Sequence, residues 1–583
     1  MRFFHNMFTL DLRSLALLRV GTAAVLILDL VQRWSDLAAH YSDAGILPRQ
    51  ALLKFYGSFH LTIHTLSGEA GIVGVLFAVQ LVFAMMLLVG YRTRLATIVS
   101  WALLVSLQNR NPAICYGGDS VMRMLLFWGM FLPWGLRFAL DAGRLKVQEL
   151  GTRALHLGTI GYVLQIALIY WSATLLKNGA EWITDFSAVY YALALDELKS
   201  PFTDWLYNKP PWVHQSLTVG TLAWEGLGPF LLLLPWWRTR LIGVLGFLAL
   251  HIGFGLFMRL GIFPYISCVC VLGFLPAEFW DRFAERTARK SLPTVTLFVD
   301  GTCGFCQRAV AALQSLLVWS GVEVVHAQTD AQATEHMNTA RSWVLHEEDT
   351  WRTGYDVFPA LVRRSRLWWW SWKLWSAIKP LGKRVYRFVA DRRDRMRGLS
   401  VPRGLQGARM YTHSTFVAML CMASLVYVVF VNVVSVSQER LKIPQQANQV
   451  GQVFKIVQNW SMFAPYPYKS DGWYIIDGRL NNGTSLDLMT GLPITEDKPA
   501  QVSAMFKNTR WSKYYRSLRK GNHKKLLPYW RRYFVNTWNA DRPEKEHIDA
   551  FNLVFMHERT RPDYQTPVIR SRVIYRYRSS KAE

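Results

Sequence analysis

Acidic residues are scarce in this chain of 583 residues: 40 Asp and Glu stand against 66 Lys and Arg, which gives a formal net charge of +26. Only 18% of the residues are charged, whereas 51% are hydrophobic and 14% are aromatic. This composition is unusual for a soluble protein and typical of a polytopic membrane protein with basic cytoplasmic loops. The basic residues flank hydrophobic runs and form no stripe, so nucleic acid is not an expected partner. The length leaves room for two to four domains.

Cysteine is also scarce, with six residues. Two of them, Cys303 and Cys306, form a C-x-x-C pair. A zinc site there would need a second pair of ligands, and the nearby His326 and His336 are irregularly spaced, so no metal is expected. The other four lie in or beside apolar segments and are expected to be packing residues: Cys115, Cys268, Cys270 and Cys421.

No cleavable signal peptide is evident, because the first apolar run has no small-residue cleavage site. That run is expected to be the first membrane anchor. A helix crosses a bilayer with about 20 apolar residues, and on this basis the sequence predicts about nine transmembrane helices. Eight apolar runs lie at 14–31, 70–89, 95–108, 119–135, 155–177, 214–235, 241–258 and 262–277, and a ninth lies at 413–436.

The basic residues predict the orientation of these helices. Arg2 and Arg13 favour a cytoplasmic N-terminus, and Lys or Arg clusters follow the second, fourth, sixth and eighth runs, as the positive-inside rule requires. The chain is therefore predicted to be a multi-pass protein of a bacterial inner membrane. Lys177, at the end of the fifth run, falls on the outer side, and the region 440–583 is expected to be periplasmic.

Lys177 is an ionisable residue at the end of a predicted membrane helix. Apolar surroundings disfavour the charged form of an amine, so a lysine there can act as a base near neutral pH. The alternative is that Lys177 reaches the interface and pairs with Glu181, one helical turn further on. Both interpretations stay open at this point.

The turn before the fourth run, at 109–119, lies on the same predicted face as Lys177. Gly117 and Gly118 permit a tight backbone, and Asp119 either caps the next helix or takes a catalytic role. Arg110 and Gly118 in this turn are candidate substrate-binding residues.

Several motifs in this region resemble the HTTM family over residues 10–280. They include "YSDAGILPR", "NRNPAICYGGDSVMRMLLFWGMFLPWG" and "IYWSATLLKNGAEW". That family is similar to the vitamin K-dependent γ-carboxylases, which couple oxidation of a hydroquinone by oxygen to carboxylation of glutamyl side chains. The resemblance implies that Lys177 deprotonates a hydroquinone, with Glu181 and Trp182 in register as substrate-binding residues.

One departure from the carboxylases concerns a functional histidine before the fourth run. This chain has Gly117, Gly118 and Asp119 in its place. An aspartate can accept a proton or orient a ligand, but it cannot donate as a cation. The resemblance therefore implies a quinone- or lipid-sized ligand and base chemistry at Lys177 more firmly than it implies carboxylation.

After residue 290 the pattern changes to a strand at 294–300, the C-x-x-C pair, a helix at 308–317 and a strand at 322–326. This order is typical of a thioredoxin-like α/β domain. The helix N-terminus stabilises the thiolate of Cys303 and lowers its pKa, while Cys306 is placed to resolve a mixed disulfide. With Asp300, the motif resembles the DCC thiol-disulfide oxidoreductases over 293–397, and a reducing cytoplasm would keep the pair a redox-active dithiol.

A basic tract follows at 363–409, with fourteen Lys or Arg against two Asp and a tryptophan cluster at 368–372. It is expected to lie on anionic lipid headgroups, although a solvated helix face is the alternative after residue 386. Its last part, 398–412, is predicted to be a juxtamembrane linker.

The region 440–583 alternates strand and helix patterns and is predicted to be a soluble α+β domain. Its "QNWSMFAP" and "DGWY" stretches resemble the tail of HTTM chains. It is expected to be a structural lid over the helix ends, or to bind an acidic protein or a lipid headgroup. The sequence thus predicts a membrane bundle at 1–285, a thioredoxin-like domain at 293–397, a ninth helix at 413–436 and the C-terminal α+β domain at 440–583.

Three functions are open from the sequence. The first is a membrane enzyme in which Lys177 acts as base on a quinol-like or lipidic substrate, with the dithiol feeding or sensing redox state. The second is a membrane-anchored thiol-disulfide oxidoreductase in which only Cys303 and Cys306 react. The third is a non-catalytic membrane scaffold.

Overall fold

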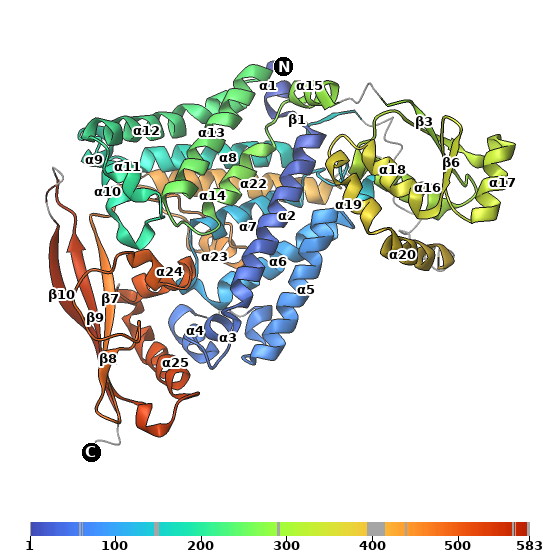
Figure 1. Cartoon of the computed structure of the whole chain (residues 1–583). Coiled ribbons are helices and arrows are strands. Elements are labelled where there is room, and N and C mark those ends of the chain that lie inside the picture. The colour runs from blue at the N-terminus through green and yellow to red at the C-terminus, as the bar shows by residue number, and fades with distance from the viewer. Residues whose placement is uncertain are drawn as a thin grey trace.

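The computed structural model describes residues 2–57, 60, 62–144, 151–287, 292–392, 414–437, 440–519, 521–562, 565 and 567–579. The protein has three parts, which are a helical bundle, a small α/β domain and a C-terminal α+β domain (Figure 1). The α/β domain and the C-terminal domain lie on opposite sides of the bundle. The predicted linker 398–412 lies outside the described residues.

Six helices in the described part of the chain are long and apolar enough to cross a membrane, and the protein is a multi-pass membrane protein. At 1.5 Å per residue, a helix of 20 residues spans about 30 Å, the thickness of the hydrocarbon core. These helices are α2 (Leu12–Trp34), α5 (Ala70–Val89), α8 (Leu157–Leu176), α12 (Pro211–Leu233), α13 (Trp237–Phe257) and α22 (Thr415–Val436).

The predicted number of about nine transmembrane helices is not confirmed. The run at 119–135 forms α7 (Gly117–Gly129), whose 13 residues extend about 20 Å and are too short to span. The run at 95–108 forms α6 (Thr93–Arg110), which ends in the polar Gln108, Asn109 and Arg110. The run at 262–277 gives α14 (Phe263–Leu272), which bends by 91° into the charged α15 (Ala277–Thr287). Counting that bent pair as one span gives seven.

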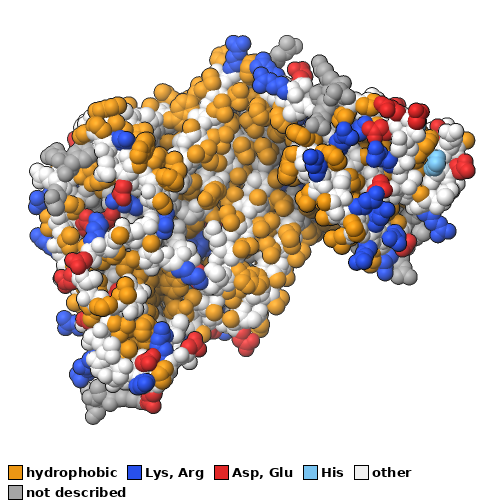
Figure 2. Space-filling view, viewed as in Figure 1, with side chains coloured by type: hydrophobic (Ala, Val, Ile, Leu, Met, Phe, Trp, Pro, Cys, Tyr) orange, Lys and Arg blue, Asp and Glu red, His pale blue; other side chains and the backbone are white. Residues whose placement is uncertain are grey.

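The outer helices turn apolar side chains away from the protein. Ile72, Val75 and Val82 of α5 are each about half exposed, as are Leu245 and Ile252 of α13. Figure 2 shows the result as a broad hydrophobic surface over the bundle, with charged side chains gathered on the two soluble parts at either side. An apolar surface of this extent matches a lipid environment.

Shorter helices and one small sheet complete the bundle. A buried arginine on α2 satisfies helix-end carbonyls: Arg19 donates to the carbonyls of Leu87 (2.7 Å) and Leu88 (3.1 Å) where α5 ends. The other elements are α1 (Arg2–Phe8), β1 (Leu10–Asp11), α3 (Leu37–Tyr41), α4 (Arg49–Tyr56), β2 (Arg153–Ala154), α9 (Ala180–Ile183), α10 (Ala188–Ala194), α11 (Thr203–Tyr207) and α23 (Gln445–Val453).

The α/β domain contains the predicted strand, helix and strand. They are β3 (Val295–Val299), α16 (Gly304–Leu317) and β4 (Val322–His326), and β3 pairs with β4 in parallel. Two antiparallel strands, β5 (Val344–Glu347) and β6 (Thr350–Thr353), complete a sheet of order β4-β3-β5-β6. The remaining helices are α17 (Ala331–Ala340), α18 (Val357–Arg363), α19 (Trp372–Ala377) and α20 (Lys379–Asp391).

The C-terminal domain is an antiparallel sheet of order β10-β9-β7-β8, with two helices against it. The strands β7 (Ser470–Leu480), β8 (Ser485–Asp487) and β10 (Val568–Arg578) form at the strand patterns 472–480, 485–491 and 572–578. The helices α24 (Thr509–Leu518) and α25 (Leu527–Asn539) form at the helix patterns 509–520 and 527–539, whereas no such pattern predicts β9 (Ile548–Arg559). The buried side chains of this domain and of the bundle form one continuous hydrophobic core, from Leu15 to Phe555. The domain therefore packs directly on the helix ends.

Candidate functional site

Lys177 caps the C-terminal end of α8 and is buried, with 5% of its side chain exposed. Its ammonium group forms an ion pair with Glu225 of α12, and its Nζ lies 5.1 Å from the centre of the Trp182 ring. The alternative in which Lys177 pairs with Glu181 is wrong, because Glu181 is bonded to Lys469 of the C-terminal domain instead. Lys177 is thus held inside the protein by a partner on another helix and does not reach the interface.

Lys177 and Glu225 line a cavity of about 440 Å³ between the bundle and α24. Most of its wall is apolar, with Ile169 and Ala173 of α8, Phe254 of α13, and Phe263 of α14. Cavities of about 300–1,000 Å³ with apolar walls and a few polar groups are typical of sites for small ligands.

A second polar pair faces the same cavity. The hydroxyl of Tyr170 lies 2.8 Å from Nε2 of His251, and both residues are buried. Each is on a membrane helix, and the tyrosine ring also stacks on Phe247 at 4.0 Å. The cavity wall therefore contains two pairs of side chains that can exchange protons. One pair is Lys177, at the end of α8, with Glu225 of α12, and the other is Tyr170 of α8 with His251 of α13.

Asp119 lies outside the cavity, in a buried cluster of charges. Arg33 and Arg510 both bind it, the latter at 3.0 and 3.1 Å, and the same two arginines bind Asp29 at 2.7 and 2.6 Å. Its carboxylate also accepts the backbone N–H of Tyr116 at 2.9 Å, in a capping box at the start of α7. Asp119 therefore caps the helix, as one of the two interpretations predicts, and ties α2 and α7 to α24.

The remaining predicted binding residues in the bundle are also separate from the cavity, except Trp182, which lines it. The guanidinium of Arg110 is buried and donates to the carbonyls of Leu47 (2.7 Å) and Ser42 (3.1 Å). Gly118 packs against the backbone of Phe263, where a Cβ would lie 3.0 Å from the amide nitrogen. These two residues hold the turn against its neighbours.

Cys303 and Cys306 lie at the start of α16, where they were predicted. Cys303 is the N-cap residue, and the backbone N–H of Cys306 donates to its Sγ at 3.4 Å. Burial raises the pKa of the Cys303 thiol, but hydrogen bonds from the Cys306 side chain and from the amides of Cys306 and Phe305 outweigh it, so its pKa lies below the usual value.

Family models match two stretches of this chain. An HTTM domain covers residues 8–280, and a DCC1-like thiol-disulfide oxidoreductase covers residues 297–399. The chain contains an HTTM domain followed by a DCC1-like domain. The comparisons with curated proteins and with solved structures gave no match.

The cysteine pair of the DCC1-like domain borders its own cavity, of about 820 Å³. Cys306 lines it together with aromatic side chains from Phe305, Phe358 and Trp375. No group of three or more His, Cys, Asp or Glu that could hold a metal occurs among the residues that the structure describes.

The cavity of the HTTM domain includes residues that sequence reasoning missed. Glu225, Tyr170 and His251 are all buried in apolar helices, and none of them was named as a candidate, although Tyr170 lies within "IYWSATLLKNGAEW" and His251 begins the motif "HIGFGLFMRLGIFPYISCVCVLGFLP". An ionisable residue inside a membrane helix is itself a signal of function, and this signal identifies Glu225 and His251 within their apolar runs.

The hydrogen bonds to Cys303 lead to a pH prediction. Because the pKa of Cys303 is lowered, its thiolate persists to lower pH than that of an ordinary thiol, whose pKa is about 8.5. We expect the rate of iodoacetamide labelling at Cys303, followed by peptide mass spectrometry, to have its midpoint below that value. Burial slows labelling at every pH and leaves the midpoint unchanged. Cys303→Ser identifies the peptide, and a midpoint at or above 8.5 would contradict the prediction.

Proposed function

We propose that the protein is an integral membrane enzyme in which Lys177, with Glu225, acts as base on a quinol-like or lipidic substrate in the cavity of the HTTM domain. The observation that carries this proposal is the buried Lys177–Glu225 pair in the wall of an apolar cavity. A buried ion pair is weak evidence for stability, because desolvation offsets the attraction of the charges. Its position beside a cavity of ligand size favours a chemical role.

The proposed step is a proton transfer from a substrate hydroxyl. In the proposed step Glu225 accepts a proton from the ammonium of Lys177, which leaves an amine beside the cavity. The amine then accepts the hydroxyl proton: the O–H bond breaks, an N–H bond forms, and the new ammonium stays beside the oxyanion. The Trp182 ring, 5.1 Å from Nζ, gives that ammonium a cation–π contact.

A quinol suits this site because most of the wall area is apolar, while Lys177, Glu225 and His251 supply polar groups for its hydroxyls. When bound, a quinol would supply an acidic hydroxyl and two electrons. The carboxylases that the HTTM motifs resemble use such a ligand. Because Asp119 is held by Arg33 and Arg510, we assign the second proton-handling role to Tyr170 and His251.

A second function is supported by the cysteine pair of the DCC1-like domain, to which we assign a thioredoxin-like fold. The Cys303 thiolate attacks a substrate disulfide, one substrate thiolate leaves, and Cys306 then displaces the second, so the substrate gains two electrons and the pair becomes a disulfide. The hydrogen bond from Cys306 to Cys303 (3.4 Å) supports this assignment.

We further propose a bacterial inner membrane, with the DCC1-like domain cytoplasmic and the C-terminal domain periplasmic. The two domains lie on opposite sides of the bundle (Figure 1). Electrons would therefore pass between the dithiol and the Lys177 cavity by a mobile carrier. The exposed Trp368, Trp369 and Trp370, beside the basic α20, are proposed to lie on anionic headgroups.

The test of the enzyme proposal is the ligand that co-purifies with the protein. We expect organic extraction and mass spectrometry to detect a quinone with wild-type protein in detergent, and the bound amount to change in Lys177→Ala. Lys469→Ala is the matched control, because it removes a lysine near the same helix end but outside the cavity. No quinone-sized ligand in any of the three proteins would contradict the proposal and favour the thiol-disulfide function.

A further inference from the structure

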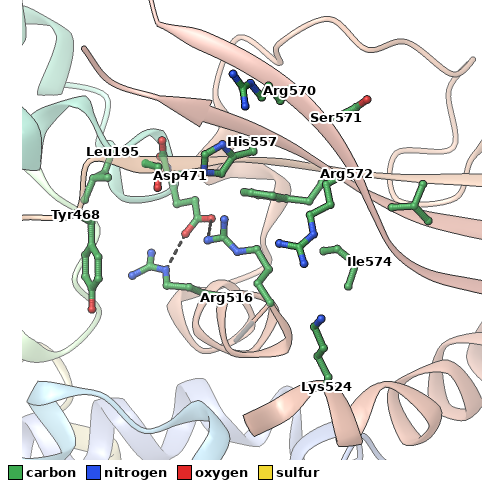
Figure 3. Close-up of a pocket in the computed structure, with 15 residues that line it drawn as sticks. Leu195, Tyr468, Asp471, Arg516, Lys524, His557, Arg570, Ser571, Arg572 and Ile574 are labelled. Carbon is green, nitrogen blue, oxygen red and sulfur yellow. Dashed lines mark hydrogen bonds and ion pairs between the residues drawn. The ribbon is translucent and has the colours of Figure 1, made fainter. Parts of the chain in front are cut away.

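The C-terminal domain contains a cleft of about 570 Å³ between one face of its sheet and the segment formed by α24 and η13 (Gly521–Leu526). It adjoins the Lys177 cavity, and Tyr468 and Arg516 line both. Figure 3 shows β9 and β10 along one side of this cleft, with α24 and Lys524 below.

Five cationic side chains line the cleft, against two acidic ones. Two of the five are held by Glu197, at 2.8 Å from Arg516 and 2.7 Å from Arg519. These bonds are drawn as dashed lines in Figure 3. Arg519 also lies 3.9 Å from the centre of the Phe555 ring. The two arginines are thus fixed in place and share a single negative charge.

The other three cations are Lys524, Arg570 and Arg572. Among the described residues, none of them has a recorded hydrogen bond or ion pair, and each is exposed. The register places Arg570 opposite His557 and Arg572 opposite Phe555, so both arginines lie on the face toward α24. In Figure 3 the guanidinium of Arg572 and the ammonium of Lys524 point into the same space. Like charges that converge without a counter-ion repel one another, and a bound anion relieves this repulsion.

The acidic residues of the cleft do not balance these charges. Asp471 is buried and accepts the backbone N–H of Glu197 at 3.0 Å, while its Oδ1 has no hydrogen-bond partner among the described residues. Burial, with Glu197 and Asp196 nearby, raises the pKa of Asp471 well above its usual value, which favours the neutral form. Burial and the surrounding arginines lower the pKa of His557. The arginines around His557 thus make the field positive at that side of the cleft, and a neutral Asp471 adds no counter-charge.

Apolar side chains complete the lining beside the cations. Phe555 and Ile574 come from the sheet, and Leu195 comes from the loop before η6 (Asp196–Leu198) of the bundle. A ligand for this cleft therefore needs a charged group and an apolar group side by side.

We propose that the cleft binds a phosphate ester with a short apolar portion, its phosphate held by Lys524 and Arg572 and its apolar portion against Phe555 and Ile574. Arg570 lies at the rim of the same cleft, apart from these two cations, and adds to its positive charge. Two unpaired cations match a dianion better than a single carboxylate. The planar fork of each guanidinium fits two phosphate oxygens at once. The ligand is either the headgroup region of an anionic lipid or a soluble phosphate ester, which present the same chemistry.

The test is binding to full-length protein in detergent, measured by isothermal titration calorimetry with three probes: dihexanoyl phosphatidic acid, glycerol 3-phosphate and inorganic phosphate. We expect the double variant R570Q/R572Q to weaken binding by about tenfold or more, because the charge-assisted contact of Arg572 and the nearby charge of Arg570 are both lost. The matched control R576Q/R578Q removes the same charge from exposed positions of β10 outside the cleft, and we expect it to bind like wild type.

Each outcome decides a part of this proposal. Binding of dihexanoyl phosphatidic acid alone identifies a lipid headgroup, whereas equal binding of glycerol 3-phosphate identifies a soluble ester. The proposal is overturned if wild-type protein binds no phosphate probe at millimolar concentration. It is also overturned if R570Q/R572Q binds as tightly as wild type, or if both double variants weaken binding equally, since the effect is then one of net charge.

Discussion

Arg510→Ala is expected to weaken the packing of the C-terminal domain on the bundle by about 3–5 kcal/mol, the usual effect of removing one partner from a buried ion pair. Arg510 is 5% exposed and binds Asp29 at 2.6 Å and Asp119 at 3.0 Å. Without it, two buried aspartates share the single cation of Arg33, and one negative charge has no partner. We expect a lower midpoint of thermal unfolding in detergent and faster proteolytic release of the domain.

Lys507→Ala is the matched control for this effect. Lys507 belongs to the same interface and binds Asp36 at 2.7 Å, but its side chain is 56% exposed. An exposed pair contributes about 0–1 kcal/mol, so the control is expected to unfold close to wild type. Equal midpoints for the two variants would show that the buried cluster does not hold the domain.

Lys177→Met is expected to lower turnover of a quinol-like substrate by roughly 10²–10⁴-fold, the usual contribution of a positioned general base. The variant keeps the length and the apolar stem of the side chain while removing the amine. Glu225 then lacks its partner, so Lys177→Met/Glu225→Gln, in which neither charge remains, separates lost chemistry from lost folding. The measurement is quinol oxidation by purified protein, with thermal unfolding in parallel.

Two further variants distinguish the proposed functions. Cys303→Ser is expected to leave quinol oxidation intact when electrons are supplied by added quinol, and to abolish reduction of disulfides. Lys469→Met removes a lysine that binds Glu181 outside the cavity and is expected to oxidise quinol like wild type. Full quinol turnover in Lys177→Met would rule out Lys177 as the base.

The elements with strong local patterns were predicted from the sequence. The long apolar runs became α2, α5, α8, α12, α13 and α22, and the C-x-x-C pair lies at the start of α16 as expected. The central strand β9 was missed because its apolar and polar residues follow no simple alternation, although both β7 and β10 pair with it. The structure has six helices that could cross the membrane in its described part, fewer than the nine predicted. A helix must be long enough to cross, and α7 has only 13 residues and packs inside the bundle.

The site was predicted only in part. The sequence named Lys177 and Trp182 as candidates, and both line the cavity. One of its two interpretations paired Lys177 with Glu181, because helical spacing was the only distance that the sequence offered. The structure breaks the helix at Lys177 and turns its amine toward Glu225, which is 48 residues away along the chain. Asp119 was singled out by its neighbouring glycines, whereas its partners Arg33 and Arg510 come from segments that no local pattern relates to it.

The sequence by itself determined that this is a multi-pass membrane protein with a dithiol domain, because hydrophobic length and the C-x-x-C spacing are local properties of the chain. The tertiary structure alone decided which buried charges meet: Lys177 with Glu225, and Asp119 with Arg33 and Arg510. The physical reason is that a charge in an apolar interior needs a partner within a few ångströms. Packing between distant segments, rather than spacing along one helix, determines where that partner lies.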